Sequence, residues 1–467
     1  VAGRPGGHGQ RGKVPESSYT PVRGAPIRRL VRFGVLAALG IFSGLGTTML
    51  VGCGSSATGA GSNLDADGSA KLDAGQDGDA TGSTDGPAPD GPFSPAPHPA
   101  LPQVMNSGGP VLVAPKVLPI LFDGDTGASD IAGFFQELTH TAYWTEATSE
   151  YGVGELTLLP SVTMAGTAPA TISDAALQAA VVANTSGTNP LWGPADPSTV
   201  YLFALPQGTI ESDTGGACCT DYGGYHSETT AGAVPLPYAV ICTCPGFDGP
   251  GSVLDGRTIA MSHELVESAT DPFPNTNPAY LYEDDADLVW KIVTGGEVAD
   301  MCELNEDAFF APPGSSYVIQ RVWSNAAAAA FQDPCVPERT TAPYFNTFPA
   351  LGTISYGPGS HAFATQAVNI PIGQTVTIAL NLSSAAPTAG VWSVKVYDAN
   401  YLKGGAANLA LALDSSRGQN GDTLHLTITP MTVDPRVDGE TFVILSEHGT
   451  PGTSNFQNSV MMGLVTN

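Results

Sequence analysis

The run MSHELVESATDPFP, residues 261–274, contains the residues best suited to metal chemistry. His263 and Glu267 are four residues apart, so on a helix their side chains share a face and can converge on one metal ion. Glu264 points about 100° away, from where a carboxylate can accept a proton from water. Zinc metallopeptidases carry H-E-x-x-H at such a site. We therefore expect a metal site in which Glu267 replaces the second histidine.

A second acidic segment downstream can complete this site. The segment GGEVADMCELNED, residues 295–307, places Glu297 and Asp300 three residues apart, on one face if it is helical. Glu297 is the predicted third ligand. Asp300 is predicted to orient the ring of His263 without binding the metal itself.

The end of the first helix supplies one more candidate ligand. Asp271 follows Glu267 by four residues, and Pro272 disfavours helical geometry in the residue before it. We expect the helix to stop at about Thr270, with Asp271 at its terminus as an additional metal ligand.

The identity of the metal depends on this ligand set. One histidine and two carboxylates are harder ligands than two histidines and one glutamate. Zn²⁺ remains the first expectation, with Mn²⁺ or Ca²⁺ as alternatives. A different interpretation is a solvated helix face, because charged pairs at this spacing are common on exposed helices. The low charged content of the chain, 13%, favours the metal site.

His226, in DYGGYHSETT, is a second candidate catalytic residue beside Glu264. It lies between two cysteine clusters, so disulfides can hold it near the helix. The functional interpretation is a metal ligand or a donor to the transition state. The alternative is a hydrogen-bonded loop histidine with no role in chemistry.

The elements around these residues predict an α+β domain at about 101–340. Strands are predicted at 111–122, 155–160, 199–206, 238–244 and 317–324, and helices at 129–152, 173–187 and 257–271. Ser129 and Ser173 are the expected N-caps of the first two helices. The segment 207–256 is long, rich in glycine and without a clear pattern except for the apolar run at its centre.

The pattern changes after residue 340. Short alternating runs separated by turn residues predict an all-β sandwich over 341–467. The predicted strands are 375–382, 392–399, 409–414, 423–430 and 441–446. This segment has no cysteine and no cluster of catalytic residues, so we expect a structural or adhesive module.

The N-terminal part predicts export and a lipid anchor. Arg28, Arg29 and Arg32 precede an apolar run at 35–51, and Leu50-Val51-Gly52-Cys53 resembles a bacterial lipobox. Residues 1–53 are then a targeting segment with Cys53 as the lipidated residue, rather than a plain signal peptide or an uncleaved anchor. Residues 54–100 have the Gly, Ala, Asp and Pro content of a disordered acidic linker.

Charge and cysteine content agree with export. The formal net charge is -27, which repels nucleic acid and anionic lipid headgroups, so no nucleic-acid partner is expected. Cys53 apart, an even number of cysteines predicts three disulfides. Clustering pairs the 218/219 set with the 242/244 set, and 302 with 335; a zinc knuckle fits the C-C and C-x-C spacings poorly. These six residues are Cys218, Cys219, Cys242, Cys244, Cys302 and Cys335.

Residues 215–340 resemble the characteristic region of the phosphate-induced, EXORDIUM-like proteins, in their bacterial form. The resemblance rests on GGACCTDYGGYH, YAVICTCPGFDG, SHELVESATDPFP and GGEVADMC with Cys335, in this order. It implies secretion from the cell. Plant members lack the His and Glu of the helix motif, whereas bacterial relatives that retain them resemble zincin-type metallopeptidases. By this resemblance the α+β domain is zincin-like.

Together these features predict an exported lipoprotein at the outer membrane or cell surface that hydrolyses peptides or cell-envelope material. His263, Glu267 and Glu297 hold the metal in this hypothesis, and Glu264 activates water. The alternative is a non-catalytic cell-surface or cell-wall binding protein with a structural or vestigial metal site.

Overall fold

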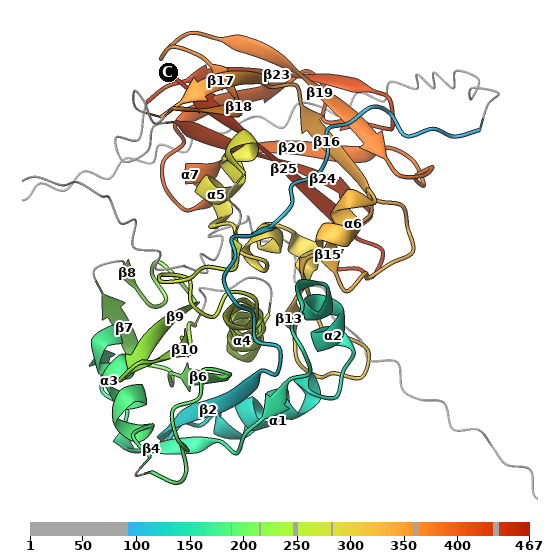
Figure 1. The fold of residues 1–467 in the computed structure, drawn as a ribbon. Helices are drawn as coiled ribbons and strands as arrows, with labels where there is room; N and C mark the ends of the chain where they lie inside the picture. Colours follow the sequence, from blue (N-terminus) through green and yellow to red (C-terminus); the bar gives the residue numbers. More distant parts are fainter. Residues whose placement is uncertain are drawn as a thin grey trace, which may run out of the picture. The chain divides into compact units, whose positions relative to one another are not determined.

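Helix α4, which carries the metal-ligand motif, packs against a mixed β-sheet in this computed structural model (Figure 1). The structure describes residues 92–467, except 188, 214–215, 246–250, 282–283, 358–361 and 433–438. The sheet follows the order β3-β2-β6-β10-β9, and β4 also pairs with β2. Its strands are β2 (Lys116–Asp123), β3 (Thr157–Leu158), β4 (Val162–Thr167), β6 (Thr199–Ala204), β9 (Gly224–Ala231) and β10 (Val234–Ile241).

The centre of this sheet is apolar on both faces. Every residue of β6 is buried, as expected for a parallel strand covered on both sides. Strands β2, β6 and β10 run parallel, whereas β9 runs antiparallel to β10 and ends the path of paired strands. Strand β9 lies inside the segment 207–256, where the sequence predicted no strand before residue 238.

Helix α4 (Val253–Thr270) begins and ends at well-defined signals. Ser252 and Asp255 form a reciprocal capping box at its start. The helix stops at Thr270 as predicted, with Asp271 as its C-cap. All of its residues from Gly256 to Thr270 are buried, so His263, Glu264 and Glu267 are enclosed rather than solvated.

The predicted helix over 129–152 is wrong, because three short helical elements occupy this range. They are α1 (Ala128–Leu138), α2 (Tyr143–Thr148) and the 3-10 turn η1 (Ser149–Tyr151). Thr139 ends α1 by bonding its hydroxyl back to the carbonyls of Phe135 and Gln136, a local bond that competes with helix continuation. Gly127, not Ser129, occupies the N-cap of α1.

The remaining helices are short apart from α3, whose N-cap Ser173 accepts a hydrogen bond from the Ala176 backbone as predicted. They are α3 (Asp174–Asn184), α5 (Val289–Thr294), α6 (Asn325–Ala329) and α7 (Ala399–Leu402), with 3-10 turns η2 (Asp285–Asp287), η3 (Asp300–Cys302) and η4 (Glu306–Ala308). Among the described residues, no helix is long and apolar enough to cross a membrane.

Several two- and three-stranded sheets connect these elements. They pair β1 (Met105–Asn106) with β11 (Tyr280–Leu281), β12 (Phe309–Phe310) with β13 (Ile319–Gln320), β14 (Val322–Trp323) with β15 (Cys335–Val336), and β5 (Thr171–Ile172) with β7 (Ile210–Asp213) and β8 (Gly216–Ala217). Strand β13 packs directly on α4 and so brings Gln320 to the candidate site.

Two further β-sheets form the C-terminal part of the chain. One has the order β16-β19-β23-β21 and the other β17-β18-β25-β24-β20-β22. Leu380 and Leu426 of the first sheet and Phe442 and Leu464 of the second are fully buried in a common core. All the strand pairs of these two sheets are antiparallel except β18 with β25, which run parallel.

The strands of these two sheets cover every run predicted after residue 341. Their bounds are β16 (Phe345–Pro349), β17 (Gly352–Tyr356), β18 (Phe363–Asn369), β19 (Val376–Ser384), β20 (Trp392–Asp398), β21 (Leu409–Leu413), β22 (Arg417–Gly418), β23 (Thr423–Pro430), β24 (Glu440–His448) and β25 (Gln457–Thr466). The described chain as a whole is rich in β-strand, with few long helices.

The predicted disulfides are confirmed. Cys218 bonds to Cys242 and Cys219 to Cys244, which fastens the start of β9 to the end of β10. Cys302 bonds to Cys335 and ties the segment after α5 to strand β15. The predicted targeting segment, its Cys53 and the linker to residue 91 lie outside the described residues.

Candidate metal centre

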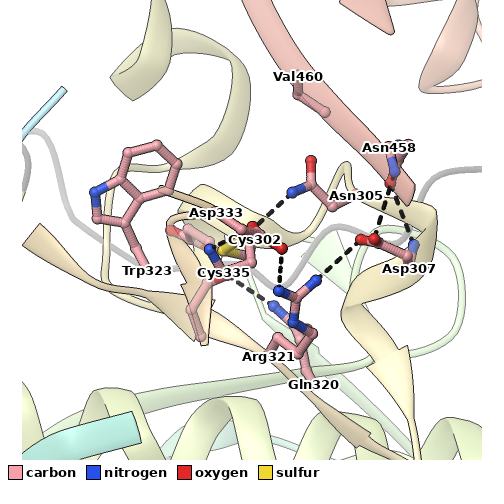
Figure 2. Close-up of a disulfide and its surroundings, with 12 residues drawn as sticks. Cys302, Asn305, Asp307, Gln320, Arg321, Trp323, Asp333, Cys335, Asn458 and Val460 are labelled. Atoms are coloured by element: carbon pink, nitrogen blue, oxygen red, sulfur yellow. Dashed lines mark hydrogen bonds and ion pairs between the residues drawn. A yellow bond between two sulfur atoms is a disulfide. The ribbon is translucent and has the colours of Figure 1, made fainter. Parts of the chain in front are cut away.

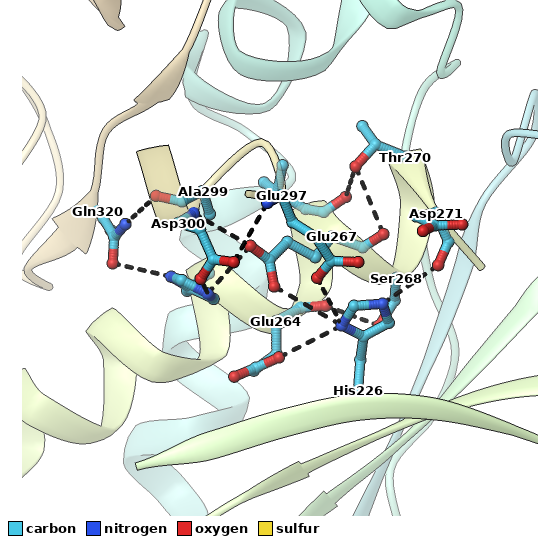
Figure 3. A network of polar contacts seen from close by, with 12 residues as sticks. His226, Glu264, Glu267, Ser268, Thr270, Asp271, Glu297, Ala299, Asp300 and Gln320 are labelled. Atoms are coloured by element: carbon cyan, nitrogen blue, oxygen red, sulfur yellow. Dashed lines mark hydrogen bonds and ion pairs between the residues drawn. The ribbon is translucent and has the colours of Figure 1, made fainter. Parts of the chain in front are cut away.

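Helix α4 presents its three motif residues to a closed interior. His263 is fully buried, and Glu264 and Glu267 are each 1% exposed. His263 and Glu267 lie one turn apart. Figure 3 shows Glu264 and Glu267 directed toward His226. A solvated helix face, the alternative to a metal site, is therefore wrong for this segment.

His226 enters the centre from strand β9. Its Nδ1 atom lies 3.6 Å from one carboxylate oxygen each of Glu264, Glu267 and Glu297 (Figure 3). Its Nε2 lies 3.1 Å from the backbone carbonyl of Asp271. A carbonyl only accepts, so Nε2 donates its proton there. In the neutral ring Nδ1 is then a bare lone pair that faces three carboxylates.

Glu297 and Asp300 reach the centre from a loop, not from a helix. Helix α5 ends at Thr294, and Asp300 begins the turn η3. The segment is not helical at Glu297, so the shared helix face that depended on this condition does not apply. Gly295 has a φ of +108°, and a Cβ there would lie 2.3 Å from Asp300 Oδ2, so only glycine allows this tight turn.

Backbone contacts lock this loop onto helix α4. The Asp300 N–H donates to Glu267 Oε1 at 3.1 Å, and the Glu297 N–H donates to Asp300 Oδ2 at 3.2 Å. The disulfide of Cys302 with Cys335 holds the loop from its other side (Figure 2). The carboxylates of Glu297 and Glu267 are thus fixed beside each other even though both are acidic.

A buried ion-pair cluster supports the same region. Arg321, fully buried, pairs with Asp307 at 3.1 Å and with Asp333 (Figure 2). Asp307 also exchanges backbone and side-chain hydrogen bonds with Asn458 of β25. The segment that carries the two acidic site residues is therefore braced by charged groups as well as by the disulfide.

Gln320, which the sequence analysis did not select, orients His263. Its Nε2 donates to the Ala299 carbonyl at 2.7 Å, so its Oε1 faces the His263 Nδ1 at 3.0 Å and accepts its proton. His263 Nε2 then faces Glu267 Oε1 at 3.1 Å and Asp300 Oδ1 at 3.5 Å. A glutamine within the apolar predicted strand 317–324 was the signal that could have identified this residue.

Without a cation, burial and mutual charge interactions shift the pKa values of the histidines and carboxylates in this centre. Burial alone would lower the pKa of His226 and His263, but the carboxylates around them raise both above the usual value. Burial, followed by repulsion from Glu267, raises the pKa of Glu297 well above its usual range and that of Asp300 to about 7. Only Glu267 has a lowered pKa, because the two histidines outweigh its burial. Protons therefore hold the centre together when no cation does.

The donor atoms fit a divalent metal ion. His226 Nδ1, Glu264 Oε1 and both carboxylate oxygens of Glu297 are buried and have no hydrogen-bond donor within the described chain. Ligands about 2.0–2.1 Å from a tetrahedral zinc ion lie about 3.3 Å from one another. The separations of 3.1–3.6 Å around the two histidines match that spacing.

The geometry divides the donors into two groups whose ligand atoms lie within 4.8 Å of one another. One is His226, Glu267 and Glu297, and the other is His263, Glu264 and Glu267. The predicted trio of His263, Glu267 and Glu297 is not brought together as such, since His226 rather than His263 shares a group with Glu297.

Asp271 lies outside both groups of converging donors, and Asp300 lies beside His263 of the second group. Asp271 Oδ1 accepts from the Ala279 N–H at 2.8 Å, and neither group of converging donors includes Asp271. Asp300 contacts His263, as predicted for an orienting carboxylate, but at Nε2 instead of at Nδ1, which Gln320 occupies.

Comparisons with known proteins identify no family. The sequence matches no protein-family model and no curated protein. Among solved structures, domains 4 and 5 of the S-layer protein SbsC match 34% of this chain and 89% of that chain, at 13% identity and a TM-score of 0.15. A TM-score this low supports no statement about fold or function.

Proposed function

We propose that this protein is a metal-dependent hydrolase of peptide bonds. The observation that carries the proposal is the position of His226 Nδ1, which faces three buried carboxylates at 3.6 Å. A lone pair among carboxylates is repulsive unless a proton or a metal cation lies between them. Beside this group, the adjacent pair His263-Glu264 supplies the residue types of a metallopeptidase helix.

Each residue has a role in this proposal. His226, Glu267 and Glu297 hold the metal ion, and the Asp271 carbonyl keeps the His226 ring in the tautomer that binds it. Such an ion polarises a carbonyl oxygen and lowers the pKa of water. Glu264 accepts the proton from the attacking water, since its Oε1 is buried without a hydrogen-bond donor.

The ligand set bears on the choice of metal. Two carboxylates beside one imidazole favour harder ions than the two histidines and one glutamate of a typical catalytic zinc site. We propose Zn²⁺ as the first metal to test, with Mn²⁺ and Ca²⁺ as the alternatives.

Extended peptides are the proposed substrates. Strand β9 carries His226 and ends its sheet, and no strand of the described chain pairs with its outer edge. Its second half, Glu228–Ala231, is partly exposed. An edge strand beside a reactive centre can align an extended peptide through backbone hydrogen bonds.

Export and family membership remain part of the proposal. The three disulfides support an oxidising compartment. A lipid anchor at Cys53 and a location at the outer membrane or cell surface rest on the sequence of residues 28–53. Membership of the EXORDIUM-like proteins, and a zincin-like fold, rest on the sequence blocks and on helix α4 packed against a mixed sheet.

One observation favours a second candidate function, a closed structural metal site in a cell-surface binding protein. The side chains of the centre are at most 1% exposed, and structural metal sites leave no open position for substrate. In that case the ion stabilises the fold, and the protein acts through another surface.

Activity and metal content measured together distinguish the metal-dependent hydrolase from the structural metal site. The full-length protein, purified in detergent, is incubated with a peptide library before and after removal of metal by a chelator. Chelator-sensitive cleavage that Glu264→Gln lowers at least about 100-fold, with metal retained, supports the hydrolase. Glu146→Gln, on the exposed face of α2, is the control and should cleave normally. Tightly bound metal without cleavage supports the structural site, and a protein that binds no metal overturns both.

A further inference from the structure

Each carboxylate oxygen of Glu267 lies close to a different histidine. Its Oε2 lies 3.6 Å from His226 Nδ1, and its Oε1 lies 3.1 Å from His263 Nε2 (Figure 3). The two rings come from different elements, β9 and α4, and contact different oxygens of Glu267. Glu267 is the one residue common to both groups of converging donors among the described residues.

The membership of the two groups points to two ion positions. Donor atoms that bind one ion at about 2.1 Å lie at most about 4.2 Å apart. His226 converges with Glu297, whereas His263 converges with Glu264, and the two histidines fall in different groups. The geometry therefore offers each histidine an ion position of its own.

The group of His263, Glu264 and Glu267 has further features that favour binding of an ion. Gln320 Oε1 accepts a hydrogen bond from His263 Nδ1, which directs Nε2 toward Glu267 and Asp300. Asp300 Oδ1 is fully buried, lies 3.5 Å from His263 Nε2 and has no hydrogen-bond donor in the described chain. Glu264 Oε1 is likewise buried and without a donor.

Charge balance with deprotonated carboxylates favours two divalent ions over one. Five buried carboxylates gather here with two histidines: Glu264, Glu267, Asp271, Glu297 and Asp300. With neutral rings, one divalent ion leaves a net charge of about minus three, and two leave about minus one, which one retained proton cancels. A charge buried at this depth without a counter-charge strongly destabilises the fold.

We propose that the centre is dinuclear, with two divalent cations bridged by Glu267. His226 and Glu297 complete the first position, and His263 and Asp300 complete the second, beside which Glu264 keeps its role as the base. The proposal rests on the metal site of the proposed function and adds a second ion to it. Paired ions joined by a carboxylate are a known means of clamping the attacking and leaving oxygens of a hydrolysis.

Manganese loading of the full-length protein tests this without any activity assay. The chelated protein is dialysed against Mn²⁺, and bound metal is counted by elemental analysis beside an electron paramagnetic resonance spectrum. We expect two equivalents and the spectrum of an exchange-coupled pair. His226→Ala and His263→Ala should each retain one equivalent with the spectrum of an isolated ion. His425→Ala, an exposed histidine paired with Asp414, should retain both.

The outcomes distinguish the second ion from the metal site itself. One equivalent in the unmodified protein, lost completely in either histidine variant, overturns the dinuclear centre and leaves a single site standing. No bound metal in a protein with native circular dichroism overturns both. If an alanine variant does not fold, the stoichiometry and coupling of the unmodified protein still decide the question, and His263→Gln replaces that variant.

Discussion

His226 Nδ1, on edge strand β9, lies 3.6 Å from a carboxylate oxygen of Glu297, in the loop after α5. Neither residue belongs to the helix that carries the recognisable motif. The contact joins the sheet to the loop across α4, and it gives the centre a ligand set that the motif alone does not contain.

Removing the imidazole of His226 should weaken metal binding more than substituting a histidine on the surface. His226→Ala deletes the one nitrogen that faces Glu297, and it leaves three carboxylates without a counter-charge. We expect the affinity for the first ion to fall by at least about 100-fold, measured by competition with a chromophoric chelator. His140→Ala, on the surface after α1, should leave the affinity unchanged; an equal loss in both variants would contradict the assignment.

Gln320→Leu should weaken metal binding without touching any ligand. The leucine removes the acceptor of His263 Nδ1 and the donor to the Ala299 carbonyl, so the ring loses its orientation. Loss of such an orienting partner typically costs about 10–100-fold in metal affinity. Gln366→Leu on β18, which bonds only the hydroxyl of Thr353, is the matched control. Unchanged affinity in Gln320→Leu would show that the ring is held in another way.

The metal-free protein should lose stability as the pH rises. The pKa of Asp300 is raised to about 7 and those of His226 and His263 lie above their usual value, so each favours the fold in its protonated form. Their contribution is present at low pH and is lost as the pH passes through the folded values. Glu267, with its lowered pKa, acts in the opposite direction but only on acidification.

Urea unfolding from about pH 5 to about pH 8 measures this dependence. The free energy of unfolding of chelated protein should fall over that range, and added Mn²⁺ should reverse the trend because its ligands must be deprotonated. Asp300→Asn should flatten the metal-free curve. A metal-free protein that gains stability toward pH 8 would contradict the expectation.

Gly295→Ala should damage the centre through the backbone. The residue combines a φ of +108° with a Cβ position 2.3 Å from Asp300 Oδ2. We expect a loss of about 1–3 kcal/mol in unfolding free energy and displacement of Asp300 from His263. Gly373→Ala has a comparable positive φ, +75°, but open space around its Cβ. Only the Gly295 variant should lose metal, and equal metal content in the two would refute the displacement.

The sequence predicted the elements whose patterns are local. Helix α4, its end before Pro272, the strands after residue 341 and the disulfide partners all follow from periodicity, capping and clustering. The ends of helices were harder to predict. The predicted helix over 129–152 is interrupted at Thr139, whose hydroxyl donates hydrogen bonds to the backbone carbonyls of Phe135 and Gln136. Such a bond is specific to one conformation and leaves no period in the sequence.

The site was harder to predict because half of it depends on tertiary contacts. Strand β9 is polar, and its pairing with β10 through the turn at Gly232, with φ +67°, was the missed signal of a hairpin. That hairpin sets the place of His226. Glu297 follows a pair of glycines in positive-φ conformation, so no helical spacing could describe its direction.

The disulfide between Cys302 and Cys335 affects how fast a bound metal ion can leave the site rather than how tightly it binds. It closes the loop of Glu297 and Asp300 against β15, while buried Arg321 anchors the neighbouring segment. An ion enclosed behind this loop can leave only when the loop opens, so its residence is governed by the rate of a local opening. A protein that meets its metal while folding would then keep that ion long after the surrounding supply has changed.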